Sequence, residues 1–165
     1  MNDKQKAPGI VSGGDAARVE KGFSSSRRID EIIVHCSATR PEQGFTAADV
    51  RRWHTRERGF CDIGYHFVVE TDGSVSAGRP LDRAGAHCRG HNARSVGVCY
   101  MGGIGADGKP ADTRNAAQKA AMRELLSALA RSFPGARIRS HRDFARKACP
   151  CFDATAEYAP LCGGG

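Results

Sequence analysis

The sequence lacks a long apolar run. Hydrophobic residues make up 40% of its 165 residues, yet no run approaches the roughly 18 apolar residues that a membrane-spanning helix needs. The N-terminal segment also lacks a basic stretch followed by the roughly 7–15 apolar residues of a secretory signal. The first absence excludes an integral membrane protein, so we expect no membrane span. The second predicts synthesis in the cytoplasm without a signal peptide.

Acidic residues are too few to balance the basic ones. The chain has 25 Lys and Arg against 18 Asp and Glu, which leaves a net charge of +7. Such a charge favours anionic partners, among them nucleic acid, acidic lipid and bacterial cell-wall polymer. The basic residues are scattered, however, and form neither a recognition helix nor an aromatic platform. We therefore expect no nucleic-acid partner and interpret the charge as a general attraction to an anionic wall.

A complete set of internal disulfides is also excluded, because the chain has seven cysteines. Several of them, such as Cys36 and Cys99, lie inside apolar runs, where a reduced cysteine behaves as a small hydrophobic residue. We interpret this usage as that of a reducing compartment, with one or two thiols kept for metal chemistry.

Strand and helix patterns alternate along the middle of the chain. Strands are predicted over 29–36, 65–70, 74–77, 95–101 and 136–140, and helices over 46–59 and 115–133. The second helix is the clearest, because its apolar residues recur on one face. Thr46 with Asp49, and Asn115 with Gln118, have the spacing of N-terminal caps. Together these elements predict a single α/β domain, a central mixed sheet flanked by helices.

The two ends of the chain have a different composition. Residues 1–27 are polar, rich in Gly and Ser and without amphipathic period, which predicts a flexible arm. Residues 161–165 are interpreted as a loose tail. The folded domain is expected over residues 28–160, at roughly one domain per 150 residues.

Two of the six histidines stand at the ends of predicted strands. His35 ends the strand over 29–36, and His141 follows the strand over 136–140. Strand ends are where a sheet presents side chains to a site, and Cys149 follows eight residues after His141. Two imidazoles and a thiolate suit Zn²⁺ and leave a fourth position open. Spacing alone leaves two alternatives: packed core residues, or Cys151 as the thiolate donor.

Five segments together carry a family resemblance. They are IIVHCSAT (32–39), GYHF (64–67), DGSVSAGRP (72–80), GAHCRGHNARSVGVCYMGG (85–103) and SHRDFARKACPCFD (140–153). In this order they resemble the zinc-dependent N-acetylmuramoyl-L-alanine amidases of type 2, which include phage lysozyme-type amidases and peptidoglycan-recognition proteins. The resemblance implies an α/β fold with one Zn²⁺ in a surface cleft. It also implies hydrolysis of the amide bond between the lactyl group of N-acetylmuramic acid and L-alanine of the peptidoglycan stem peptide.

The resemblance implies roles for seven residues. The zinc ligands are His35, His141 and Cys149, the further catalytic positions are Tyr65 and Lys147, and the substrate-binding positions are His87 and Asn92. The cationic side chain of Lys147 can stabilise the oxyanion that develops during hydrolysis. The phenol of Tyr65 can position the water or form a hydrogen bond to the tetrahedral intermediate. Bound water, the phenol and the ammonium remain alternatives for protonating the leaving nitrogen.

Other polar residues are expected to have structural roles. His66 neighbours Tyr65 on a strand, so the two side chains face opposite sides. His66 is interpreted as a core residue or as one that supports the site residues from behind. His54 and His91 are interpreted as surface or helix-packing residues, and Arg27 as a solvated charge.

The expected partner is bacterial peptidoglycan, and we expect a monomer. A phage or prophage endolysin is predicted, reaching the cell wall after holin-type release, specialised export or lysis. One alternative is a peptidoglycan-binding protein without activity, although such relatives lack the cysteine ligand that Cys149 supplies here. A basic regulator that binds nucleic acid or a polymerase is the other alternative.

Overall fold

One five-stranded sheet organises the part of the chain that the computed structural model describes, residues 22–163. Its strands are β1 (Glu31–Cys36), β2 (Phe67–Val69), β3 (Val75–Ala77), β4 (Ser95–Tyr100) and β5 (Arg137–Ser140). They lie in the order β3-β2-β4-β1-β5. β2 and β3 pair antiparallel, and the other neighbours pair parallel. The predicted mixed sheet and α/β class are confirmed.

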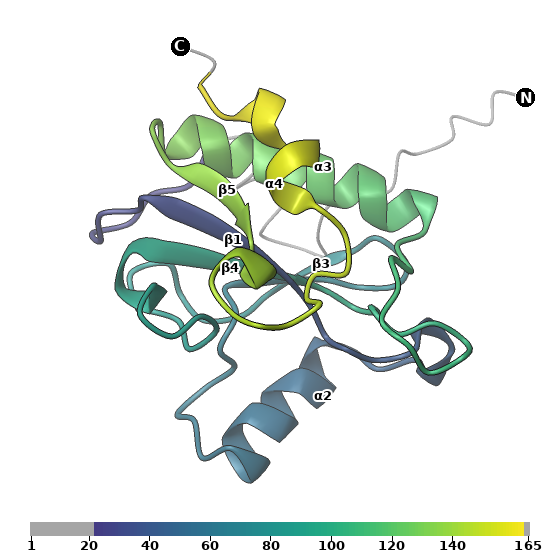
Figure 1. Cartoon of the computed structure of the whole chain (residues 1–165). Helices are drawn as coiled ribbons and strands as arrows, with labels where there is room; N and C mark the ends of the chain where they lie inside the picture. The colour runs from purple at the N-terminus through teal and green to yellow at the C-terminus, as the bar shows by residue number, and fades with distance from the viewer. Residues whose placement is uncertain (1–21, 164–165) are drawn as a thin grey trace, which may run out of the picture.

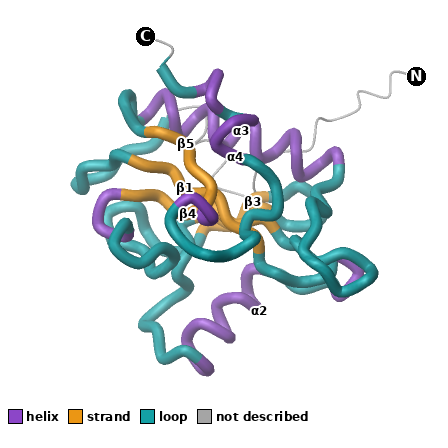
Figure 2. The backbone as a smooth tube through the Cα atoms, in the orientation of Figure 1, coloured by secondary structure: helices purple, strands orange, loops and turns teal. Residues whose placement is uncertain are grey.

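Helices cover both faces of this sheet (Figures 1 and 2). The long helix α3 (Ala116–Ser132) lies along one face, close to the short helix α4 (Ala154–Glu157), and α2 (Ala47–Arg52) lies on the opposite side. On the α3 side, Ile32 and Val34 of β1 share the larger core with the helix. Because side chains alternate along a strand, the next residue, His35, faces the α2 side.

Helix α3 follows the predicted pattern closely. Its apolar residues Met122, Leu125, Leu126 and Leu129 are fully buried. Asn115 caps the first turn, since its Oδ1 accepts a hydrogen bond from the amide of Gln118 at 2.8 Å. The helix ends where Pro134 and Gly135 follow in the sequence, as such residues disfavour further helix.

The predicted helix over 46–59 is only partly regular. The α-helical part, α2, ends at Arg52, and the chain continues through a π-helical turn over Trp53–Glu57. Single π-turns inside helices are frequent at functional sites. Here the turn carries the buried His54, whose Nδ1 accepts a hydrogen bond from the amide of Gly64 at 2.9 Å. The apolar period of the sequence favours a helix but carries no information about this contact with the segment that follows.

The described part of the predicted N-terminal arm contacts the domain. Phe23 packs edge-on against Phe67, with ring centroids 5.2 Å apart, and its amide donates a hydrogen bond to Oγ of Ser132. The guanidinium of Arg27 donates to four backbone carbonyls, including that of Leu81 at 2.8 Å. The prediction of a solvated Arg27 is therefore wrong. Residues 1–21 and 164–165 lie outside the described residues.

Two expectations from the sequence, free thiols and no membrane span, can be compared with the described residues. All seven cysteines are free thiols, so none of residues 22–163 is joined by a disulfide. Within the same residues, no helix has the length and apolarity to cross a membrane.

We expect the stability of the domain to depend on the core beneath α3. Leu125 is fully buried in the larger core, so Leu125→Ala should lower the free energy of unfolding by about 2–5 kcal/mol, through lost burial and the cavity left behind. Urea denaturation measures the loss. Arg123→Ala on the exposed face of the same helix is the control and should change stability by less than about 0.5 kcal/mol. Equal losses in both variants would contradict this packing.

Candidate active site

Two neighbouring parallel strands bring the first two candidate ligands together. In the β1–β5 register Val34 lies opposite Ser140. The next residue of each chain segment is therefore His35 and His141, at the same edge of the sheet. Their ring centroids are 4.5 Å apart, and both side chains are buried. The structure confirms that the two predicted strand ends meet.

The segment after β5 brings Cys149 to the same place. Its carbonyl accepts a hydrogen bond from the amide of Arg142 at 2.8 Å, and the hydroxyl of Tyr100 donates to the carbonyl of Pro150 at 2.7 Å. The amide of Cys36 donates to Sγ of Cys149 at 3.3 Å, a contact that holds the sulfur beside the end of β1. A backbone amide gives no side-chain signal, which is why the sequence does not reveal this contact.

The three side chains form a donor cluster, defined as His35, His141 and Cys149. One ligand atom from each lies within 4.8 Å of the others. Nδ1 of His35 is 3.8 Å from Sγ of Cys149, and tetrahedral zinc spaces such a pair by about 3.5 Å. Nδ1 of His141 is buried without a hydrogen-bond partner among the described residues, as a ligand atom would be without its ion. The cluster fits a zinc ion.

The second thiol near the site has other contacts. Sγ of Cys151 lies 3.8 Å from Sγ of Cys36 and donates to the carbonyl of Gly103 at 3.3 Å. Cys151 is not part of the donor cluster. Of the two thiols that spacing alone leaves open, the structure groups Cys149, the one that the resemblance implies, with the histidines.

Burial keeps the histidines of the cluster neutral. It lowers the pKa of His35 well below 6.5, and the charges of His87, His141 and Lys147 add to this shift. Burial also lowers the pKa of His141, with a smaller contribution from Lys147. Neutral imidazole is the form that binds a metal, because protonation occupies the lone pair. Both side chains are therefore ready to bind a cation at neutral pH.

Tyr65 and Lys147 lie beside the cluster in different surroundings. The ring of Tyr65 is 5.1 Å from that of His35, and burial raises the pKa of its phenol above 10. The phenol therefore keeps its proton and can donate a hydrogen bond. Lys147 is exposed, two residues before Cys149. As predicted, His66 points elsewhere, since its Nδ1 accepts a hydrogen bond from the amide of Gly97.

The two predicted substrate-binding residues contact the protein itself. Nδ1 of His87 lies 2.8 Å from Nε2 of His35. Oδ1 of Asn92 accepts hydrogen bonds from the amides of His87 and Cys88, both at 2.9 Å, and so shapes the loop. A substrate-binding role for His87 and Asn92 stays a prediction.

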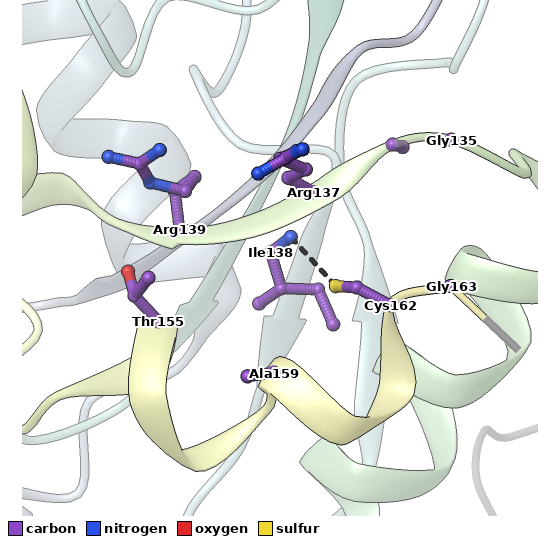
Figure 3. A pocket seen from close by; sticks show the side chains of 9 residues that line it. Gly135, Arg137, Ile138, Arg139, Thr155, Ala159, Cys162 and Gly163 are labelled. Atoms are coloured by element: carbon purple, nitrogen blue, oxygen red, sulfur yellow. Dashed lines mark hydrogen bonds between the residues drawn. The ribbon is translucent and has the colours of Figure 1, made fainter.

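A separate cavity lies beside β5, away from the cluster (Figure 3). It has a volume of about 410 Å³, and its lining includes Ile138, Thr155, Ala159 and Cys162. Figure 3 shows the hydrogen bond from the amide of Ile138 to Sγ of Cys162, at 3.3 Å. The lining contains none of the three donors.

Known proteins match this chain in sequence and in fold. A family described as N-acetylmuramoyl-L-alanine amidase matches residues 25–152. The endolysin of Escherichia phage T7 is 44% identical over 137 residues, covering 83% of this chain and 89% of that protein. The endolysin of Klebsiella phage KP32 is 44% identical over 131 residues, covering 79% and 86%. A solved endolysin from a Thermus scotoductus bacteriophage has a TM-score of 0.70 at 25% identity, covering 86% and 90%.

The mixed sheet, the donor cluster and these matches define a class, the enzymes that hydrolyse amide bonds. The chain belongs to the N-acetylmuramoyl-L-alanine amidase family, and it is an amidase of that specificity. The resemblance carried by the five sequence segments is confirmed, and so is the prediction of an enzyme.

The buried His54 beneath Tyr65 predicts a pH dependence. Burial lowers its pKa to about 4, with help from Arg58 and Arg79. The unfolded chain takes up this proton near pH 6.5, whereas the folded protein takes it up near pH 4. The contribution of His54 to stability is thus fully present above pH 6.5 and is lost as the pH falls toward 4.

We expect His54→Asn, which retains an acceptor for the Gly64 amide, to remove about 2 kcal/mol of the wild-type decrease in unfolding free energy between pH 7 and 4.5. Urea denaturation with chelator present measures both proteins at each pH. Identical pH profiles would contradict a neutral, buried His54.

Proposed function

We propose that this chain is a zinc-dependent endolysin. It hydrolyses the amide bond between the lactyl group of N-acetylmuramic acid and L-alanine in bacterial peptidoglycan. His35, His141 and Cys149 hold the ion. The observation that carries the proposal is the donor cluster, with three ligand atoms within 4.8 Å of one another. Two imidazoles and one thiolate leave a fourth position open, as in catalytic rather than structural zinc sites.

Zinc in this cluster supplies Lewis-acid polarisation of the substrate carbonyl and a water of lowered pKa. The protein's task is then to receive the carbonyl and to stabilise the charge that develops on its oxygen. Lys147 is exposed and close enough to affect the pKa of both His35 and His141. Its ammonium stabilises the developing oxyanion.

Tyr65 contributes the second polar group. Its ring lies 5.1 Å from that of His35, and its high pKa keeps the phenol protonated. It acts as a hydrogen-bond donor that orients either the attacking water or the tetrahedral intermediate. Tyr65 comes from the segment before β2 and Lys147 from the loop after β5, so the substrate lies between two separate parts of the chain.

The relatives of this chain support a biological role for the amidase. The phage proteins that match along most of this chain are endolysins, and we propose the same role here. The chain would act as a monomer on the cell wall, after holin-type release, export or lysis. The amidase domain would extend over residues 28–160. The net charge of +7 would add a general attraction to the anionic wall.

Digestion of purified sacculi tests the activity and its metal together. Zinc-loaded protein should release stem peptides with an L-alanine amino terminus and leave the glycan intact, as mass spectrometry of the products identifies. Cys149→Ser should reduce release by more than about 100-fold, since loss of an outer partner alone costs 10–100-fold. Cys151→Ser is the matched control and should retain activity, because Cys151 is outside the donor cluster.

Four outcomes would contradict the proposal. Unchanged release in the presence of chelator, or by Cys149→Ser, would exclude the zinc mechanism. New reducing sugar ends would indicate a glycosidase. Binding to sacculi without release of peptide would favour the non-catalytic alternative.

Substitution of Tyr65 and Lys147 tests their separate roles. Tyr65→Phe and Lys147→Met should each reduce kcat by about 10²–10³-fold, the usual cost of removing one group that stabilises a developing oxyanion. Zinc content should stay at one ion per chain, because neither side chain belongs to the donor cluster. Loss of zinc in either variant would show a structural role instead. An unchanged kcat with raised KM would assign the residue to substrate binding.

A further inference from the structure

His87 makes a direct contact with a residue of the donor cluster. Its Nδ1 lies 2.8 Å from Nε2 of His35, and the two rings are nearly perpendicular, at 88°. The nitrogen on the other side of the His35 ring, Nδ1, is the one near Sγ of Cys149, at 3.8 Å. His35 thus faces the cluster with one nitrogen and His87 with the other.

The hydrogen-bond pattern sets which nitrogen carries each proton. A neutral imidazole has one N–H and one lone pair, so a lone pair on Nδ1 of His35 requires the proton on Nε2. That N–H donates to Nδ1 of His87, which must then carry its own proton on Nε2. Nε2 of His87 lies 3.1 Å from Oγ of Ser95, a hydroxyl that can accept it. The hydrogen bonds are therefore consistent with one direction of donation, from His35 to His87 and from His87 to Ser95.

Packing leaves the ring of His87 little freedom. It lies against two glycines, and a Cβ added at Gly85 or at Gly97 would lie only 2.6 Å from its Cδ2. The amide of His87 is bound by Asn92, and Ser95 is fully buried. The ring is therefore oriented before any metal binds.

From these contacts we propose that His87 is a positioning residue for the metal site. It keeps the proton of His35 on Nε2 and directs the lone pair of Nδ1 toward the ion. This inference rests on the proposed function, because it takes the donor cluster as the zinc site. Both ring nitrogens of His87 are engaged within the protein, which leaves the carbon atoms and the faces of the ring for any contact with substrate.

Three variants separate this role from a general effect on folding. His87→Leu has a similar shape and no acceptor for His35. His87→Asn restores an acceptor, since Oδ1 of asparagine occupies nearly the place of Nδ1. His66→Asn is the matched control, because His66 is also a buried histidine of this region but has no hydrogen bond to the donor cluster among those of the described residues.

The first measurement is zinc affinity, by competition with a chromophoric chelator. Removal of an outer hydrogen-bond partner of a metal-binding histidine costs about 10–100-fold in affinity. We expect that loss in His87→Leu, and affinities within a few-fold of wild type in His87→Asn and His66→Asn. A folded His87→Leu protein that binds zinc as tightly as wild type would overturn the proposal. Equal losses in His66→Asn would do the same.

The second measurement needs neither zinc nor a substitution. Long-range ¹H–¹⁵N correlation spectra of the zinc-free wild-type protein report which nitrogen of His35 is protonated. We expect the proton on Nε2. A proton mainly on Nδ1 would overturn the proposal even if His87→Leu failed to fold. If wild type bound no zinc, the proposed function would fail, while this spectrum would still decide whether His87 orients His35.

Discussion

The parallel pairing of β1 with β5 is the constraint on which the site depends. Its register sets Val34 opposite Ser140, so the next residues, His35 and His141, lie side by side with ring centroids 4.5 Å apart. A shift by one residue would turn one of the two imidazoles to the other face, because side chains alternate along a strand. The same pairing buries Ile32 and Ile138 beneath α3, so packing and ligand geometry are specified together.

Backbone groups and a glycine contribute to the surroundings of the donor cluster. The amide of Cys36 contacts the sulfur of Cys149, and Gly97 leaves the space that the ring of His87 occupies. These groups cost little conformational entropy to order, because the sheet has already ordered their backbone. The amidase thus combines a rigid sheet edge, which carries the histidines, with a loop that supplies Cys149 and Lys147.

Prediction from sequence succeeded where one local pattern decides the structure. The amphipathic helix over 115–133 matches α3 within a residue at each end, and every predicted strand exists. It failed where a distant contact decides. The second part of the predicted helix over 46–59 becomes a π-turn that carries the buried His54. Arg27, which the sequence predicts to be a solvated charge, donates to four carbonyls of other segments. Local periodicity carries no information about such partners.

The sequence by itself determined the class of the domain, the family and the candidate ligands, because hydrophobic period and motif order are properties of the chain alone. Only the tertiary structure decided which atoms meet. It brought the thiol of Cys149, which the resemblance implies as a ligand, within reach of the histidines, and it turned the ring of His87 toward His35. Both choices depend on distances between segments that lie more than 50 residues apart in the chain, and such distances are set by the packing of the sheet and its loops.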